Sequence, residues 1–233
     1  MKNVFFALLL FLSIASQIYS ASSCTEKENS DALKQRVCEN LPTLAGWCSP
    51  EKAEHLIDLI LEVKPKVCVE IGVFGGSSIF PVASALNFLE EGIVIAIDPW
   101  DIQECIMYLD PITDVAHLNW WEEVDLDDIF IQYVNMLKKY SLFDHCVTMR
   151  TTSEKAAAHI DTIDILHIDG NHSEPASTLD VSLYLPKVRS GGYIWMDDHI
   201  GWPQTQAAFR LLQEACDLIK TVDDGNCILF KKR

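Results

Sequence analysis

Basic side chains are scarce in this chain. Its 233 residues include 18 lysines and arginines against 34 aspartates and glutamates, which gives a formal net charge of -16. Nucleic acid is a dense array of negative phosphates, so this charge opposes binding to it. We therefore expect no nucleic-acid partner.

Long apolar runs are also scarce, and the clearest one lies at the N-terminus. Lys2 precedes an apolar run over residues 4–12, and small residues follow around Ser20, which is the pattern of an export signal. The run is too short to favour a membrane-spanning helix of about 20 residues. We interpret residues 1–20 as a signal peptide or an N-terminal anchor. This predicts an exported or membrane-tethered protein, and a cytosolic one if the segment is not used.

The chain contains no C-x-x-C pair, which argues against a zinc site built on that spacing. All eight cysteines follow residue 20, and this even number is compatible with disulfides in an oxidising compartment. Cys68 and Cys146 fall in predicted strands, where a buried apolar role is favoured. Cys38 and Cys48 are the first candidates for a bridge.

The chain is long enough for one α/β domain and too short for two with linkers. Residues 21–46 are predicted to form a helical segment, and residues 47–233 the domain itself. Helical patterns alternate with apolar strands along most of the domain, which predicts a mostly parallel sheet. Strands over 218–222 and 227–231 flank a hairpin turn, so the sheet should end antiparallel. Residues 101–124 show no clear periodicity and are predicted to be a long loop, of the kind that forms lids and binding loops.

Residues 67–78, VCVEIGVFGGSS, predict a strand, a glycine turn and the start of a helix. Glycine is needed in such a turn because close approach of a ligand to the backbone leaves no room for a Cβ atom. A dinucleotide fingerprint would read G-x-G-x-x-G and hold a phosphate at the helix N-terminus. Here Glu70 precedes the turn and would repel a phosphate, which favours a cofactor that carries an ammonium and a sulfonium group.

An acidic residue follows the next predicted strand, which spans residues 93–97. Asp98 comes roughly 20 to 30 positions after the glycine turn, where a carboxylate can accept hydrogen bonds from both hydroxyls of a ribose. A turn-forming Asp-Pro pair is the structural alternative, and the preceding glycine motif favours the ribose role. Ser153 follows a later strand over 146–149, in the loop that approaches the adenine in this type of fold.

Acids and imidazoles follow two further predicted strands. The strand over 163–168 is followed by DGNH, residues 169–172, and the strand over 193–196 by DDH, residues 197–199. Three carboxylates and two imidazoles should therefore meet at one edge of the sheet. Carboxylates at this density repel one another unless a cation compensates them, and hard oxygen ligands suit Mg2+, Mn2+ or Ca2+. An iron site of two histidines and one carboxylate is the competing interpretation.

The segments GWCSPEKAEHL, VEIGVFGGSS, IDPW and HIDGNHSEPASTLDVSLYLPKVRSGGYIWMDDH together resemble one family. It is the class I S-adenosylmethionine-dependent methyltransferases that include the macrocin and mycinamicin sugar O-methyltransferases and proteins labelled cephalosporin hydroxylase-like. The resemblance covers about residues 46–199. It implies an α/β, Rossmann-like fold with a mostly parallel seven-stranded sheet, a C-terminal antiparallel hairpin and helices on both faces.

The resemblance also implies roles for individual residues. Glu70, Gly72 and Gly76 would surround the methionine part of S-adenosylmethionine, and Asp98 its ribose. The remaining cofactor-binding candidates are Gly75, Ser77, Trp100 and Ser153. The positions of the ligands of Mg2+ or another divalent cation are taken by Asp169, Asp197 and Asp198. His172 takes the position of the general base and is, with Asp169, the catalytic candidate; the family's second metal ligand is usually a glutamate, which is longer than Asp197.

We therefore hypothesise a metal-assisted O-methyltransferase that acts on a small hydroxylated acceptor such as a sugar. The metal would lower the pKa of an acceptor hydroxyl, and His172 would take its proton near neutral pH. One alternative is a non-heme iron hydroxylase that uses His167 or His172 with Asp169. Another is a non-catalytic exported binding module on the same fold.

The export signal conflicts with a cofactor that is made and kept in the cytosol. The segment over residues 1–20 could remain uncleaved with the domain facing the cytosol, or the start codon could lie downstream. A third solution is that an exported domain has left methyl transfer. The sequence predicts no particular oligomeric state.

Overall fold

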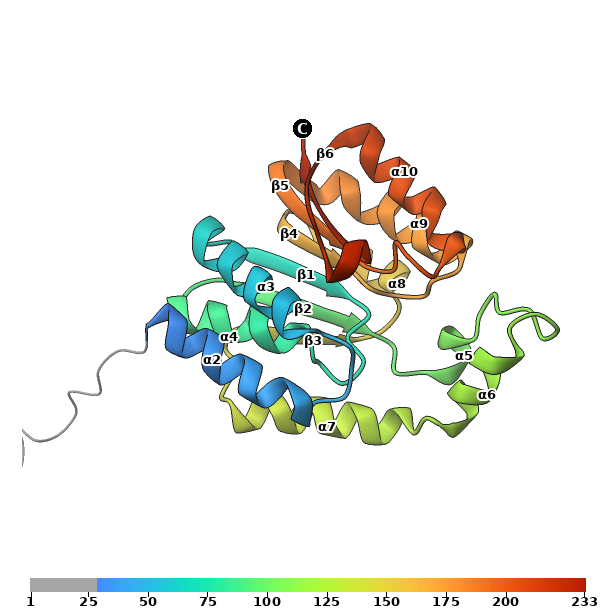
Figure 1. Cartoon of the computed structure of the whole chain (residues 1–233), viewed down its shortest axis with the longest axis horizontal. Coiled ribbons are helices and arrows are strands. Elements are labelled where there is room, and N and C mark those ends of the chain that lie inside the picture. The colour runs from blue at the N-terminus through green and yellow to red at the C-terminus, as the bar shows by residue number, and fades with distance from the viewer. Residues whose placement is uncertain (1–28) are drawn as a thin grey trace, which may run out of the picture. The chain divides into compact units, whose positions relative to one another are not determined.

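A twisted seven-stranded sheet organises this computed structural model, which describes residues 29–233 (Figure 1). The compact unit formed by most of these residues is Asp31–Arg233. The strand order is β3-β2-β1-β4-β5-β7-β6. The strands are β1 (Val67–Ile71), β2 (Ile93–Asp98), β3 (Cys146–Arg150), β4 (Ile163–Ile168), β5 (Val188–Met196), β6 (Cys216–Val222) and β7 (Cys227–Lys232).

The first five strands run parallel, and β7 is antiparallel to both β5 and β6. The predicted mostly parallel sheet with an antiparallel C-terminal hairpin is therefore confirmed. Because parallel strands all end at the same edge, the glycine turn after β1 lies beside the segments that follow β2 and β4. One difference lies in β5, which begins at Val188, before the predicted start of this strand at residue 193.

Helices cover both faces of the sheet, as predicted (Figure 1). One face packs against α2, α3, α4 and α7, and the other against α8, α9 and α10. Their bounds are α2 (Ser30–Asn40), α3 (Pro50–Val63), α4 (Ile79–Leu89), α7 (Leu126–Lys139), α8 (Ser153–Ala157), α9 (Glu174–Tyr184) and α10 (Gln206–Ala215). Short 3-10 helices connect some of them: η1 (Leu41–Thr43), η2 (Leu185–Lys187), η3 (Pro203–Thr205) and η4 (Asp223–Gly225). Leu33 and Val37 of α2 are fully buried in the shared core, so this helix is an integral part of the unit.

Local chemistry explains where α3 begins and ends. The Ser49 side chain accepts a hydrogen bond from the Lys52 amide at 3.0 Å, and Pro50 occupies the first helical position. Both features favour a helix start. Lys64 adopts a left-handed conformation immediately before Pro65, which cannot continue the helix.

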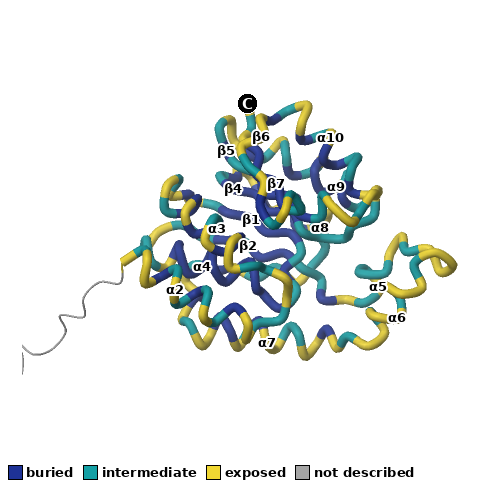
Figure 2. The backbone as a smooth tube through the Cα atoms, viewed as in Figure 1, coloured by how far each residue is buried: buried dark blue, intermediate teal, exposed yellow. Residues whose placement is uncertain are grey.

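The predicted long loop over residues 101–124 is wrong, because it contains α5 (Ile102–Cys105) and α6 (Val115–Glu123). The Asp101 side chain caps α5 by accepting a hydrogen bond from the Gln103 amide. Neither helix contains a buried residue, and Figure 2 shows this region largely exposed. Without a buried stripe there is no helical periodicity in the sequence to find.

The described cysteines are all free thiols, including Cys38 and Cys48. The expected bridge between these two is therefore not formed. The predicted export signal at residues 1–20 lies outside the described residues. Within residues 29–233, no helix has the length and apolar character needed to cross a bilayer.

Candidate functional site

The two acids that end β5 lie in different surroundings although they are adjacent in sequence. Along β5, Trp195 packs into the core that includes α3 and α4, and Met196 into the core that includes α9 and α10. Successive side chains of a strand point to opposite faces, so Asp197 returns to the side of α3. Asp198, whose backbone turns into the left-handed region at φ 66°, contacts a different partner.

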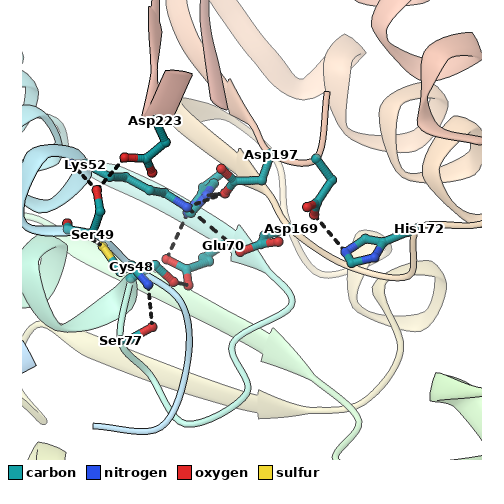
Figure 3. Close-up of polar contacts among 12 residues, drawn as sticks. Cys48, Ser49, Lys52, Glu70, Ser77, Asp169, His172, Asp197 and Asp223 are labelled. Carbon is teal, nitrogen blue, oxygen red and sulfur yellow. Dashed lines mark hydrogen bonds and ion pairs between the residues drawn. The ribbon is translucent and has the colours of Figure 1, made fainter. Parts of the chain in front are cut away.

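Asp197 is buried in a network of charged groups between the sheet and α3 (Figure 3). Its Oδ2 atom forms an ion pair with Lys52 Nζ and lies 2.6 Å from His167 Nε2. His167 in turn lies between Asp197 and Glu70, with Nδ1 3.2 Å from Glu70 Oε2. Lys52 and His167 therefore compensate two carboxylates that are buried with them.

The electrostatics of this network follow from burial and pairing. Burial would raise the pKa of Asp197, but Lys52 and His167 hold the pKa of this carboxyl well below its usual range. Burial and Lys52 lower the pKa of His167, but Glu70 and Asp197 outweigh them and raise it to about 9. His167 is therefore an imidazolium at neutral pH and donates to Asp197.

Asp169, at the end of β4, lies between this buried network and the surface. Its Oδ2 atom is 3.9 Å from Lys52 Nζ, and its side chain is 31% exposed. Burial and the nearby Asp197 raise the pKa of Asp169 well above its usual range, while Lys52 opposes that shift. Two carboxylates beside one ammonium cannot both be fully compensated.

His172 and Asp198 form a separate pair at the same edge. His172 Nε2 lies 2.7 Å from Asp198 Oδ2, and the two side chains are 31% and 16% exposed. The Trp202 ring packs against His172 at a centroid distance of 4.3 Å. This is the partly exposed imidazole–carboxylate pair that a proton-transfer site needs.

Protein atoms, rather than space for a ligand, explain two glycines of the turn after β1. A Cβ atom on Gly72, which has φ +83°, would lie 1.9 Å from the Asp169 carbonyl oxygen. A Cβ atom on Gly75 would lie 2.4 Å from the Ala45 side chain. The turn therefore packs closely against the end of β4 and against Ala45, in the segment before α3.

Glu70 does not lie where the sequence prediction placed it. It is 1% exposed, accepts a hydrogen bond from Ser78 Oγ at 2.6 Å and faces His167. Ser78 therefore uses its hydroxyl on Glu70 and does not cap α4 with its side chain. The Glu70 carboxylate therefore makes its contacts inside the protein, with Ser78 and His167.

Asp98 and Trp100 hold the glycine turn in place. Asp98 Oδ2 accepts hydrogen bonds from the amides of Val73 and Phe74, both at 2.9 Å, and Oδ1 accepts one from the Trp100 amide at 2.7 Å. The Trp100 indole nitrogen donates to the Phe74 carbonyl at 2.8 Å, and the side chain is buried. A carboxylate has about four acceptor positions, so Asp98 retains one after these three hydrogen bonds, whereas the Trp100 side chain is bound within the protein.

The two serine candidates and the last glycine candidate also have close neighbours within the protein. Ser77 Oγ accepts a hydrogen bond from the Cys48 amide at 3.3 Å (Figure 3). Ser153 Oγ donates to Asp180 Oδ1, so its hydroxyl points towards α9. Gly76 has φ +88°, and a Cβ atom there would lie 2.8 Å from Met136.

The segment that contains α5 and α6 contacts two parts of this sheet edge, the loop after β4 and the glycine turn after β1. The Asn171 side chain donates to the carbonyls of Cys105 and Met107, each at 3.2 Å, and so ties the end of α5 to the loop after β4. His117 of α6 packs against Trp202 at 4.7 Å, the residue that also covers His172.

At its other end, α6 reaches the glycine turn through aromatic rings. Trp120 packs against Trp47 at 5.7 Å and against Phe74 at 6.2 Å. Through these rings α6 links the glycine turn to Trp202, the residue that also covers His172.

The predicted metal ligands, Asp169, Asp197 and Asp198, do not fit one ion as a set. Asp197 is buried and already bound by Lys52 and His167. Ligand atoms of Asp169, His172 and Asp198 do lie within 4.8 Å of one another. An imidazole nitrogen that binds an ion cannot also take a proton, so an ion held there would compete with the base role of His172.

The iron alternative also lacks a suitable donor set. His167, Asp169 and Asp197 form a possible metal-binding group, but His167 is 3% exposed and held between two carboxylates. An oxygen-activating iron needs two histidines, one carboxylate and open coordination positions. Neither metal-binding group found among the described residues contains a second histidine.

Lys52 is the residue that sequence reasoning missed. It pairs with an acid 145 positions away, which no local pattern reveals. One signal was available, because a lysine in the first turn of a helix opposes the helix dipole and needs a compensating partner.

Comparison with known proteins places this geometry in a family. A family model described as a methyltransferase domain matches residues 69–199, which is more than half of the chain. No curated protein matches the chain by sequence.

Several solved structures share the fold. The O-methyltransferase NovP superposes with a TM-score of 0.63 at 19% identity, over 79% of this chain and 80% of that one. An O-methyltransferase from Bacillus cereus in complex with S-adenosylhomocysteine gives 0.59 at 14% identity, over 94% and 97%. TomG from Streptomyces achromogenes, involved in tomaymycin synthesis and bound to S-adenosylmethionine, gives 0.58 at 13% identity, over 94% and 95%.

Proposed function

Because this chain belongs to the methyltransferase domain family, we propose that it transfers a methyl group from S-adenosylmethionine to a hydroxyl of a small acceptor. The observation that carries this proposal is the His172–Asp198 pair, at the same edge of the sheet as the glycine turn. S-adenosylmethionine, when bound, supplies an electrophilic methyl group on a sulfonium. What the chain must add is a bound acceptor, an aligned hydroxyl and a place for its proton.

The His172–Asp198 pair supplies the place for the proton. The 2.7 Å contact between His172 Nε2 and Asp198 Oδ2 favours the tautomer with hydrogen on Nε2, which leaves Nδ1 as the acceptor atom. As the oxygen–carbon bond forms and the carbon–sulfur bond breaks, the hydroxyl proton moves to Nδ1. Asp198 then stabilises the imidazolium and fixes the ring orientation.

The residues that we propose to contact the cofactor follow β2 and β4. Asp98 retains one acceptor position for a ribose hydroxyl after its three backbone hydrogen bonds. Asp169, exposed beside Gly72, replaces Glu70 as the carboxylate able to meet a cationic group of the cofactor. The proposed reaction has no step through a divalent cation, because Asp197 is paired inside the protein.

The acceptor is a small hydroxylated molecule, for which a sugar is our first candidate. A net charge of -16 opposes a polynucleotide substrate. The Trp202 ring against His172 offers an apolar wall of the kind that packs against a sugar or aromatic ring. Export or a membrane tether through residues 1–20 remains our proposal for localisation.

Calorimetric titration with S-adenosylhomocysteine, with and without Mg2+, tests the cofactor assignment. We expect saturable binding that is the same in both conditions and weaker in Asp98→Asn. Absence of binding to the folded protein would contradict the proposal. Oxygen uptake that depends on added iron would instead favour the hydroxylase.

A further inference from the structure

Lys52 is an unusual residue for its position. It is the third residue of α3 and is 3% exposed. The positive end of the helix dipole disfavours an ammonium in the first turn, and burial removes its hydration. Two penalties therefore act on one side chain, and its surroundings must offset them.

The compensating groups are two acids that the family resemblance assigns to a metal ion. Lys52 Nζ forms an ion pair with Asp197 at the end of β5 and lies 3.9 Å from Asp169 at the end of β4 (Figure 3). The ammonium therefore lies between two strand tips, in contact with one carboxylate and near the other. No sequence motif carried this arrangement, and it does not require Lys52 to touch a substrate.

We propose that Lys52 is a built-in cation that replaces a divalent metal ion at this site, an inference that rests on the methyl transfer proposed above. Its ammonium holds Asp197 inside the protein and offsets part of the charge of Asp169. The acids can then stay together without a bound ion. Lys52 is a positioning residue, since its burial keeps it away from the acceptor, and His172 with Asp198 is left free for proton transfer.

Binding of Mn2+ tests this inference without a methyl acceptor. The electron paramagnetic resonance signal of free Mn2+ is titrated with the wild-type protein and with Lys52→Met, which keeps the chain length and removes the charge. We expect the wild type to bind Mn2+ with a Kd weaker than about 100 µM. Lys52→Met should bind at least about tenfold more tightly, because a repelling charge is removed and a carboxylate is released.

Further variants assign the effect to the pair. Lys52→Met combined with Asp197→Asn should lose the gain in Mn2+ affinity, because the released carboxylate is gone. Lys66→Met is the matched control, since Lys66 is 69% exposed and pairs with Glu91. Its Mn2+ affinity should equal that of the wild type.

Two results would overturn the inference. One is a wild-type Kd for Mn2+ tighter than about 100 µM that is lost in Asp197→Asn or His172→Ala. The other is a folded Lys52→Met that gains no affinity. If Lys52→Met does not fold, the wild-type titration decides alone. Binding of S-adenosylhomocysteine, measured on the same samples, reports separately on the proposed function: its absence sinks the methyl transfer, whereas the Mn2+ result bears on Lys52.

Discussion

The carboxyl edge of the sheet has two halves, the glycine turn after β1 and the ends of β4 and β5. The acidic residues of these two halves make different contacts. At the glycine turn, Glu70 is buried and accepts a hydrogen bond from Ser78, and Asp98 accepts hydrogen bonds from three backbone amides. At the tips of β4 and β5, Asp169 and Asp198 keep exposed atoms. The first half is a rigid support, and the second half holds the groups that can do chemistry.

The adjacent pair Asp197 and Asp198 shows the same contrast within two residues. Asp197 is buried with Lys52 and His167, whereas Asp198 is partly exposed with His172. The period of two in a strand separates them. A motif that reads DD in the sequence is therefore one buried, ion-paired acid and one partly exposed acid, to which we assign the proposed function.

The most direct test of the groups at the ends of β4 and β5 is His172→Ala. Loss of the proton acceptor should reduce the rate of methyl transfer by about 10²- to 10⁴-fold, with the affinity for S-adenosylhomocysteine nearly unchanged. Transfer of a tritiated methyl group to an acceptor found by screening small hydroxylated compounds measures the rate. His159→Ala, at an exposed position, is the control. Lost cofactor affinity in His172→Ala would show that His172 supports the pocket instead.

Replacing the two adjacent acids should separate structure from function. Asp197→Asn leaves Lys52 and His167 without their shared counter-charge, which should lower the free energy of unfolding by about 3–5 kcal/mol. Asp198→Asn should cost at most about 1 kcal/mol, since asparagine tolerates the left-handed backbone there. Asp198→Asn should instead slow methyl transfer. Urea unfolding measures both variants, and equal losses of stability would remove the distinction.

Sequence reasoning found the framework because its signals are local. The Ser49-Pro50 cap, the glycine spacing after β1 and the turn before β7 each act within a few residues. The strand tips followed, since parallel strands share one edge. The position of His172 and Asp198 at this edge was also within reach.

The sequence does not reveal that cofactor candidates such as Glu70 make their contacts inside the protein. Whether Glu70 lines a pocket or lies beneath the turn depends on His167, which reaches it from the neighbouring strand. Lys52 depends on the docking of α3 against the end of β5. Both are long-range pairings between buried charges, and neither leaves a periodic signal.

Asp180 is a buried acid that forms no ion pair with any residue over 29–233, in contrast to Asp197. Burial raises its pKa to about 6, although the hydrogen bond from Ser153 lowers it. An unfolded aspartate titrates near ~3.9, so between these values the folded state binds more protons. The stability that this group contributes is complete below pH ~4 and is lost as the pH rises through about 6.

Asp180→Asn removes that titration. At pH 7.5 the variant should be more stable than the wild type by roughly 2 kcal/mol, and at pH 4 the two should be nearly equal. Urea unfolding at both pH values measures the difference. Asp161→Asn, an exposed position on the approach to β4, should show no such divergence. A constant difference at all pH values would mean that Asp180 titrates normally.

The smallest expected effect concerns the glycine turn after β1. Trp100→Phe removes the indole donor that holds the Phe74 carbonyl at 2.8 Å but keeps an aromatic ring in the buried site. A lost buried hydrogen bond should cost about 1–2 kcal/mol of stability and weaken S-adenosylhomocysteine binding a few-fold, because the turn is part of the proposed cofactor site. Trp195→Phe is the matched control, since the Trp195 indole nitrogen has no hydrogen-bond partner among the described residues. Trp195→Phe should leave the affinity for S-adenosylhomocysteine unchanged. Equal weakening of binding in both variants would mean that the volume of the aromatic ring, rather than the hydrogen bond to the turn, supports cofactor binding.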